Sequence, residues 1–224
     1  LVGDNGQCHI RGKQFLYDSG LHVPLITRWP GHIQPGQVCD DMVMTIDICA
    51  TILQVAGITP PYALHGKPLD GEDVKKRKYV FGARDKMDDT HDAMRCIRSK
   101  QFKLIHNLMP ERAYCQLNEY KEKRYPVLAL MNVMNMKGEL NPAQAAFMAA
   151  SKPECELFDI QKDPHEIKNL ADSPEYAEVK AELLKELNLW RKSVNDQGVT
   201  DEFRKGGSSS KYPTKSLEDW EKDV

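Results

Sequence analysis

Two adjacent oxygen-bearing side chains near the start of the chain have the chemistry of metal ligands. Asp4 and Asn5 follow the apolar residues Leu1 and Val2 and precede Gly6. An apolar pair before a polar turn is typical of a buried strand that runs into a loop, and ligands bind where strands end in open α/β sheets. A carboxylate beside an amide oxygen suits calcium or magnesium better than zinc. Asp-Asn-Gly is also a common turn sequence, so a plain turn is the alternative for these residues alone.

The residues that follow this pair make the pattern more specific. Lys13 comes after Gly12, and the segments GDNG, GKQFLYDSG, HVPLI and RWPG occur in that order. Together they resemble the sulfatase family of the alkaline-phosphatase superfamily. The resemblance implies that Asp4 and Asn5 are two ligands of an active-site calcium ion and that Lys13 contacts the sulfate group. A divalent cation and a lysine would stabilise the charge that develops when a sulfate ester or sulfamate is cleaved.

The nucleophile of that family has no counterpart in the sequence. Sulfatases attack with a formylglycine made from the cysteine of a Cys-x-Pro-Ser-Arg motif, and none of the six cysteines here is followed by Pro-Ser-Arg. The acidic metal ligands that the family carries near its N-terminus are missing as well. We therefore interpret the sequence as the C-terminal part of a sulfatase, inactive alone. Because half of a sheet would be absent, we also expect exposed apolar surface and poor solubility or association.

Further residues are candidates for contacts to a sugar. Two lie between the acidic pair and the lysine, and the others lie on a charged segment, 84–89, and just after it, which we predict to be a loop at the rim of the active-site cleft. A solvated loop is the alternative for all of them. The candidates are His9, Arg11, Arg84, Asp85, Asp88 and His91.

The composition argues against several other functions. A formal net charge of −2 over 224 residues is not that of a broad nucleic-acid-binding surface. No stretch approaches the roughly 20 apolar residues of a membrane-spanning helix. The cysteines lack a paired CxxC spacing, which argues against structural zinc. We expect a sulfated carbohydrate as partner and neither nucleic acid nor membrane, with the oligomeric state left open. Family resemblance implies a periplasmic, secreted or lysosomal compartment.

The first third of the chain is predicted to hold one helix and a long loop. Apolar residues recur every three or four positions over 43–56, which indicates an amphipathic helix packed on the main sheet and ended by Gly57. Residues 59–78 contain repeated Pro and Gly and are predicted to be a loop. The basic run at 75–78 is expected to face water.

The remainder is predicted to form an antiparallel sheet with helices. Short apolar runs indicate strands at 79–83, 94–98, 102–105 and 156–160. Caps and periodicity indicate a helix that starts after Asn141, a helical turn at 163–166, a long helix over 173–194 that covers one face of the sheet, and a short helix around 217–220. A flexible stretch is expected at 205–210.

These elements give an α/β chain with the alkaline-phosphatase-like sulfatase fold implied by the resemblance. We expect residues 1–77 to be the C-terminal portion of the catalytic domain, 78–195 a small antiparallel-sheet subdomain with a long helix, and 196–224 an extended tail. The segments AMRCIRSKQFKLIHNL and CELFDIQKDPHEIKNLA resemble the N-sulfoglucosamine sulfohydrolase branch of the family in particular.

Three functions follow from these patterns. The first is hydrolysis of sulfuric esters or sulfamates of sugars, of the glycosaminoglycan type, by the complete enzyme. The second is a phosphodiesterase or phosphonate hydrolase of the same superfamily, although those relatives usually carry Asp-His where Asp4 and Asn5 stand. The third is a non-catalytic protein that binds a sugar or a partner, which the missing nucleophile favours.

Overall fold

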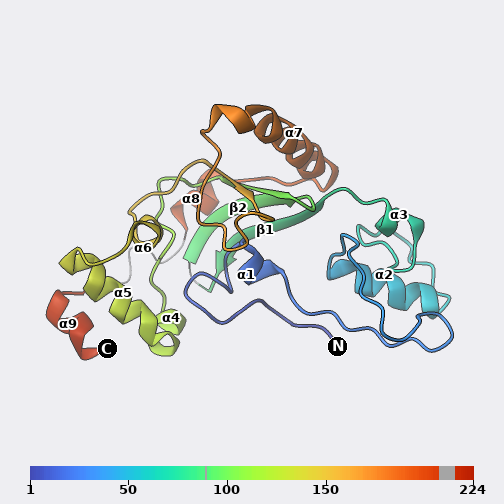
Figure 1. The fold of residues 1–224 in the computed structure, drawn as a ribbon, viewed down its shortest axis with the longest axis horizontal. Helices are drawn as coiled ribbons and strands as arrows, with labels where there is room; N and C mark the ends of the chain where they lie inside the picture. The colour runs from blue at the N-terminus through green and yellow to red at the C-terminus, as the bar shows by residue number, and fades with distance from the viewer. Residues whose placement is uncertain (89, 207–214) are drawn as a thin grey trace.

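An antiparallel sheet lies at the centre of the computed structural model, which describes residues 1–88, 90–206 and 215–224 (Figure 1). It has four strands, as the sequence predicted, and they are hydrogen-bonded in the order β1-β2-β3-β4. The strands are β1 (Val80–Met87), β2 (Thr90–Arg98), β3 (Phe102–Asn107) and β4 (Cys155–Asp159). The helices are α1 (Asp18–Leu21), α2 (Ile46–Val55), α3 (Glu72–Lys75), α4 (Glu119–Arg124), α5 (Pro126–Lys137), α6 (Pro142–Phe147), the 3₁₀ turn η1 (Pro174–Tyr176), α7 (Ala177–Ser193), α8 (Asp201–Lys205) and α9 (Leu217–Lys222).

The two faces of the sheet are covered by different parts of the chain. Side chains alternate along each strand, so Cys96 and Ile97 enter separate cores. Leu183 and Leu187 of α7 cover the Ile97 face, as predicted for the long helix. The Cys96 face is covered by residues 10–17 together with α5 and α6. The predicted boundary after residue 77 therefore does not separate two cores, because residues 10–17 pack inside the subdomain.

The first strand is longer than the sequence indicated. We predicted a strand over 79–83 and a charged loop over 84–89, but β1 continues through Met87 and pairs with β2 up to Thr90. Charged residues are tolerated on this strand because they find partners across it: Asp85 forms an ion pair with Arg95 at 2.7 Å. Asp89, the end of the predicted loop, lies outside the described residues.

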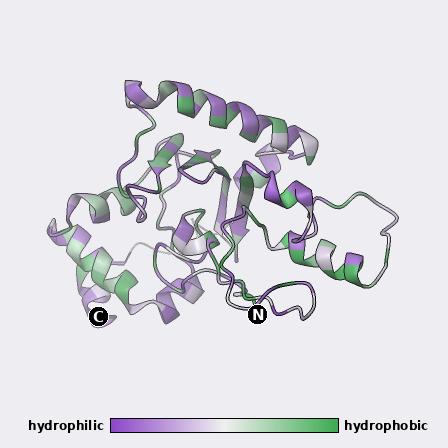
Figure 2. Cartoon of the chain, turned by 45° about the vertical axis from the view of Figure 1, so that its right-hand side comes forward, coloured by the Kyte–Doolittle hydropathy of each residue, from purple (hydrophilic) through white to green (hydrophobic). Residues whose placement is uncertain are grey.

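Two predictions near the N-terminus are wrong for the described chain. Leu1 and Val2 are not a buried strand: they are 82% and 43% exposed, and Val2 forms only an isolated bridge with Leu25. Helix α2 ends at Gly57 as predicted (φ +66°), but it does not pack on a sheet. Its Ile52 side chain is 61% exposed. Figure 2 shows hydrophobic residues, in green, on this helix. No sheet among the described residues covers these side chains.

Three smaller differences have local causes. The predicted loop 59–78 contains α3, and Arg77 of its basic run does not face water but binds Asp47 at 2.6 and 3.0 Å. Residues 163–166 form no helix, because Glu166 adopts a left-handed conformation (φ +54°). The expected tail forms α8 and α9, and Trp220 of α9 is buried against α5. Residues 207–210 of the expected flexible stretch lie outside the described part.

The helical connection between β3 and β4 forms as its caps dictate. The Asn141 side chain accepts a hydrogen bond from the Gln144 backbone in a reciprocal capping box, which confirms the predicted start of α6. The Asn118 side chain caps α4 by accepting a hydrogen bond from the backbone amide of Lys121. Across the described ranges, no helix combines the length and the apolar character that crossing a membrane requires.

Candidate active site

The residues predicted to bind a metal ion and sulfate lie on one folded segment, residues 4–20, called here the site segment. The carbonyl of Gln7 accepts hydrogen bonds from the backbone amides of both His9 (2.8 Å) and Lys13 (2.7 Å). The Gln7 amide donates to the carbonyl of Ser19 (2.9 Å). These bonds fold the segment back on itself, so Lys13 returns towards the stretch that carries Asp4.

Two glycines allow this folding because backbone atoms lie where a side chain would begin. A Cβ on Gly12 would lie 2.2 Å from the carbonyl oxygen of Gln7, the same oxygen that holds Lys13. A Cβ on Gly6 would lie 2.4 Å from the carbonyl oxygens of Ser19 and Gly20. The glycines next to the acidic pair and the lysine are therefore required by close backbone approach.

We expect Gly12→Ala to lower activity while the sheet stays folded. The added methyl group must displace the Gln7 carbonyl and so weaken the hydrogen bond that positions Lys13. Turnover of the full-length product of the gene should fall at least tenfold with little change in far-UV circular dichroism. Gly71→Ala is the matched control, because its Cβ would lie 3.0 Å from the Pro68 carbonyl, outside the site segment. Equal activity of the two variants would contradict this role for Gly12.

Buried hydrogen bonds anchor the end of the site segment to the sheet. The hydroxyl of Tyr17 donates to Glu156 on β4 (2.7 Å), and the backbone amide of Asp18 donates to Glu166 (2.6 Å). The Asp18 carboxylate accepts from Lys103 and from Arg98. The Tyr-Asp pair of the GKQFLYDSG segment therefore connects the site segment to the antiparallel sheet.

The electrostatics of this anchor differ between its two carboxyl groups. Burial by itself would raise the pKa of Asp18, but hydrogen bonds from Arg98 and the charge of Lys103 lower it below the usual value. Burial raises the pKa of Glu166 despite the nearby Lys103. The side chain of Lys103 is fully buried, and its ammonium forms ion pairs with both carboxyl groups.

The proposed metal ligands are open to a cation. Asp4 is exposed, and none of the described residues forms a hydrogen bond or an ion pair with its carboxylate. The Oδ1 atom of Asn5 accepts only a weak contact from the thiol of Cys8, at 3.7 Å. Both offer hard oxygen donors, which fit calcium. Within the described ranges, no group of three or more His, Cys, Asp or Glu side chains could hold a metal ion.

The structure places the other candidate residues in different surroundings. His9 is exposed beside the proposed ligands. Arg11 donates to the backbone carbonyls of His165 (2.8 Å) and Glu166 (2.6 Å), and its guanidinium lies 3.5 Å from the centre of the Tyr17 ring. These contacts assign Arg11 to holding the site segment against the subdomain.

Arg84 and Asp85 do not face a common site, because they point to opposite sides of β1. The guanidinium of Arg84 is buried 3.7 Å from Asp92, with the Phe15 ring 5.4 Å away, and has no hydrogen bond in the described part. Asp85 instead pairs with Arg95. The expected rim loop is a strand, so these two residues cannot act as neighbours in a loop.

Sequence reasoning missed two tyrosines that the β3–β4 connection brings to the site segment. The ammonium of Lys13 lies 5.4 Å from the centre of the Tyr120 ring. Tyr125 lies edge-on to Tyr120, with ring centres 5.7 Å apart. Burial, together with the neighbouring Tyr120, raises the pKa of Tyr125 to about 12, so its hydroxyl stays protonated at neutral pH. The only sequence signal is the NEYKEKRYP stretch, in which an asparagine cap precedes both tyrosines.

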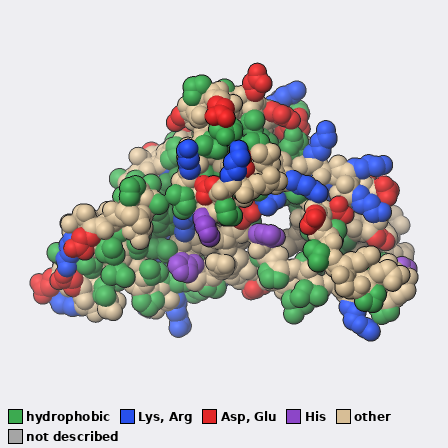
Figure 3. Space-filling model, in the orientation of Figure 1, with side chains coloured by type: hydrophobic (Ala, Val, Ile, Leu, Met, Phe, Trp, Pro, Cys, Tyr) green, Lys and Arg blue, Asp and Glu red, His purple; other side chains and the backbone are tan. Residues whose placement is uncertain are grey.

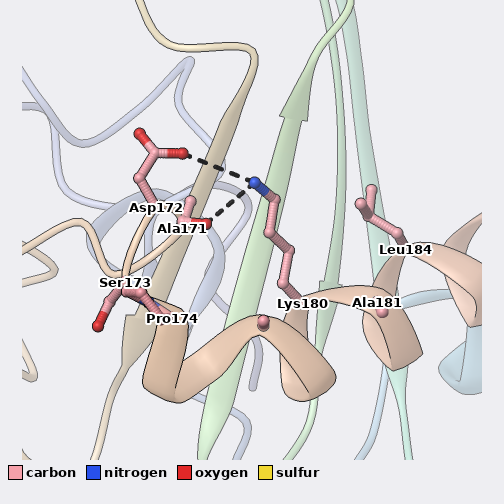
Figure 4. A pocket seen from close by; sticks show the side chains of 8 residues that line it. Ala171, Asp172, Ser173, Pro174, Lys180, Ala181 and Leu184 are labelled. Carbon is pink, nitrogen blue, oxygen red and sulfur yellow. Dashed lines mark hydrogen bonds and ion pairs between the residues drawn. The ribbon is translucent and has the colours of Figure 1, made fainter.

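Two grooves accompany these elements, and neither is the place where the site residues meet. One, of about 330 Å³, lies at the start of α7, where Lys180 contacts Asp172 and the carbonyl of Ala171 (Figure 4). It lies on the opposite face of the sheet from the site segment. The other, of about 480 Å³, lies between Asp4 and the exposed side of α2. Histidine side chains gather near the middle of the face that Figure 3 shows.

Comparison with known proteins places these features in a family. The family described as N-sulphoglucosamine sulphohydrolase, C-terminal, matches residues 6–137. An ulvan-active sulfatase of Formosa agariphila is 36% identical over 88% of this chain and 33% of its own length. The N-sulphoglucosamine sulphohydrolase of Homo sapiens is 27% identical over 89% of this chain and 42% of its own length.

A solved structure shows the same fold. It is of a protein in complex with its substrate D-glucosamine-2-N,6-O-disulfate, and it matches 85% of this chain and 32% of that chain with a TM-score of 0.56 and 23% identity. The chain thus spans between about a third and two fifths of the length of the curated relatives named above. The antiparallel sheet and long helix occur in an alkaline-phosphatase-like sulfatase fold, as predicted.

Proposed function

The chain belongs to the N-sulphoglucosamine sulphohydrolase C-terminal family, and we propose that it supplies one side of the active site of an enzyme that hydrolyses sulfuric esters or sulfamates of sugars. The observation that carries this proposal is the folded site segment. Its backbone hydrogen bonds return Lys13 towards Asp4 and Asn5, and its glycines permit no other side chain at the points of contact.

In this proposal Asp4 and Asn5 are two of the ligands of a calcium ion. Their carboxylate and amide oxygens are the donors that calcium prefers. Bound calcium would supply positive charge where the sulfuryl oxygens become more negative. Within the described ranges, no group of three or more His, Cys, Asp or Glu side chains completes a metal site, so Asp4 and Asn5 are proposed only as part of a larger ligand set.

Lys13 is proposed to bind the sulfuryl group directly. Its backbone amide donates to the Gln7 carbonyl, and its side-chain ammonium lies 5.4 Å from the centre of the Tyr120 ring. A preorganised cation costs no rearrangement as charge develops, so it lowers the barrier more than a mobile one. His9, exposed between Lys13 and the metal ligands, is proposed as a contact to the sugar or the sulfate.

A sulfated sugar of the glycosaminoglycan type is the proposed substrate. The support is the family match and the likeness to the human N-sulphoglucosamine sulphohydrolase. The matched complex contains a glucosamine that is sulfated at both nitrogen and oxygen. Amino-sugar sulfates are therefore the first substrates to test.

Removal of calcium tests this function. We expect the full-length product of the gene to release sulfate from N-sulfoglucosamine or its 6-O-sulfate, and a calcium chelator to abolish the release reversibly. Asp4→Ala should raise the calcium concentration needed for half-maximal activity at least tenfold, because one charged ligand is lost. Asp172→Ala is the control, because its side chain is 95% exposed on the far face of the sheet. Turnover that neither chelation nor Asp4→Ala changes would overturn the calcium assignment.

A further inference from the structure

We propose that Tyr120 is a sugar-contacting residue that helps to determine which sulfated substrate is accepted. This inference rests on the proposed function, because it assigns a partner to the ring beside Lys13. Nothing in the family pattern of the site segment includes this residue, which comes from α4, more than a hundred positions later in the chain.

The Tyr120 ring lies next to the group proposed to bind sulfate. The Lys13 ammonium lies 5.4 Å from the centre of the Tyr120 ring, so a sulfate bound by Lys13 brings the sugar attached to it close to that ring. Tyr120 is 36% exposed, which leaves part of its face available. Ligand sites combine aromatic surface with a few fixed polar groups, and an exposed aromatic face suits the apolar face of a pyranose.

The residue that follows Tyr120 in the sequence packs against the site segment. Lys121 is buried, donates to the Gln116 carbonyl (3.1 Å) and lies 5.5 Å from the centre of the Phe15 ring. Phe15, two residues after Lys13, is itself buried against Phe147. The contact between Lys121 and Phe15 therefore holds Tyr120 near Lys13, and this contact is part of the core packing.

A second tyrosine, Tyr125, packs against the Tyr120 ring. Tyr125 is buried edge-on to Tyr120, and its hydroxyl remains protonated at neutral pH. Tyr120 presents a partly exposed ring, whereas the hydroxyl of Tyr125 is buried without a hydrogen-bond partner among the described residues.

Steady-state kinetics with two substrates test the proposal. The full-length product is assayed with N-sulfoglucosamine and with a short alkyl sulfate, which carries no sugar ring. We expect Tyr120→Ala to raise the KM for the sugar roughly 3- to 10-fold and to raise the KM for the alkyl sulfate clearly less, because only the sugar offers a ring for Tyr120 to contact. Tyr120→Phe should retain the wild-type KM because it keeps the ring. Tyr120→Leu provides a second ring-less variant with a bulky side chain if the alanine variant does not fold.

Each outcome decides the matter. An equal loss with both substrates would show that Tyr120 acts only through Lys13, and unchanged kinetics would show that the ring contacts nothing; either result overturns the proposal. Equal losses in the alanine and phenylalanine variants would also overturn it. Failure of the wild type to release sulfate from any sugar would refute the proposed function itself, which is a distinct result.

Discussion

Lys13→Ala is expected to lower the kcat for sulfate release by about 10²- to 10³-fold, the usual effect of removing one preorganised charge-stabilising donor. Two contacts position this lysine: its backbone amide donates a hydrogen bond to the Gln7 carbonyl, and its ammonium lies 5.4 Å from the centre of the Tyr120 ring. Because the stabilised charge develops during the reaction, kcat should fall more than the KM rises. Initial rates of sulfate release, followed by ion chromatography, measure both parameters in the full-length product.

The control for this variant is Lys162→Ala, which removes a lysine whose side chain is 74% exposed beside Asp159. It should leave the kinetics unchanged. A lysine variant with near-normal kcat would show that the sulfuryl group is stabilised elsewhere, and the assignment of Lys13 would be withdrawn.

Lys103→Met is expected to destabilise the fold by about 3–5 kcal/mol, the typical cost of leaving a buried charge without its partner. Lys103 is fully buried between Asp18 and Glu166, with Glu166 at 2.8 Å. Methionine is only one heavy atom shorter than lysine and fills most of its volume, so the loss reports mainly the charge and not a cavity. Urea unfolding monitored by far-UV circular dichroism gives the free energy of unfolding.

Lys162→Met is the matched control, because exposed ion pairs contribute about 0–1 kcal/mol. The second consequence of Lys103→Met is functional. Asp18 lies at the end of the site segment, so loosening it should also lower activity at temperatures where the protein remains folded. A free energy of unfolding within 1 kcal/mol of the wild type would contradict the anchoring role of Lys103.

Local patterns were enough to predict much of the fold. Short apolar runs separated by tight turns were enough to predict four strands in an antiparallel sheet. Asn141 marks a helix start because its side chain accepts a hydrogen bond from the Gln144 backbone amide. Gly57 marks a helix end because it adopts the left-handed conformation (φ +66°) that glycine allows. The order of the motifs in residues 3–31 likewise sufficed to identify the family.

Features that depend on distant partners were not predictable in this way. The charged half of β1 is a strand because Asp92 and Arg95 lie opposite it, and charge alone had indicated a loop. The apolar face of α2 is exposed in the described chain because no sheet covers it. Tyr120 lies beside Lys13 where the neighbouring Lys121 packs on Phe15. These contacts join elements about a hundred residues apart in the sequence.

The most direct test of the central claim is the identity of the anion that the full-length product releases. It would be incubated with calcium and equal concentrations of N-sulfoglucosamine, O-sulfated hexosamines and a phosphodiester, and the free sulfate and phosphate products would be quantified. The account predicts release of sulfate from at least one sugar, with little or no cleavage of the phosphodiester, because Asn5 stands where a zinc-type histidine would be needed. Preferential cleavage of the phosphodiester, or turnover of neither class, would contradict it.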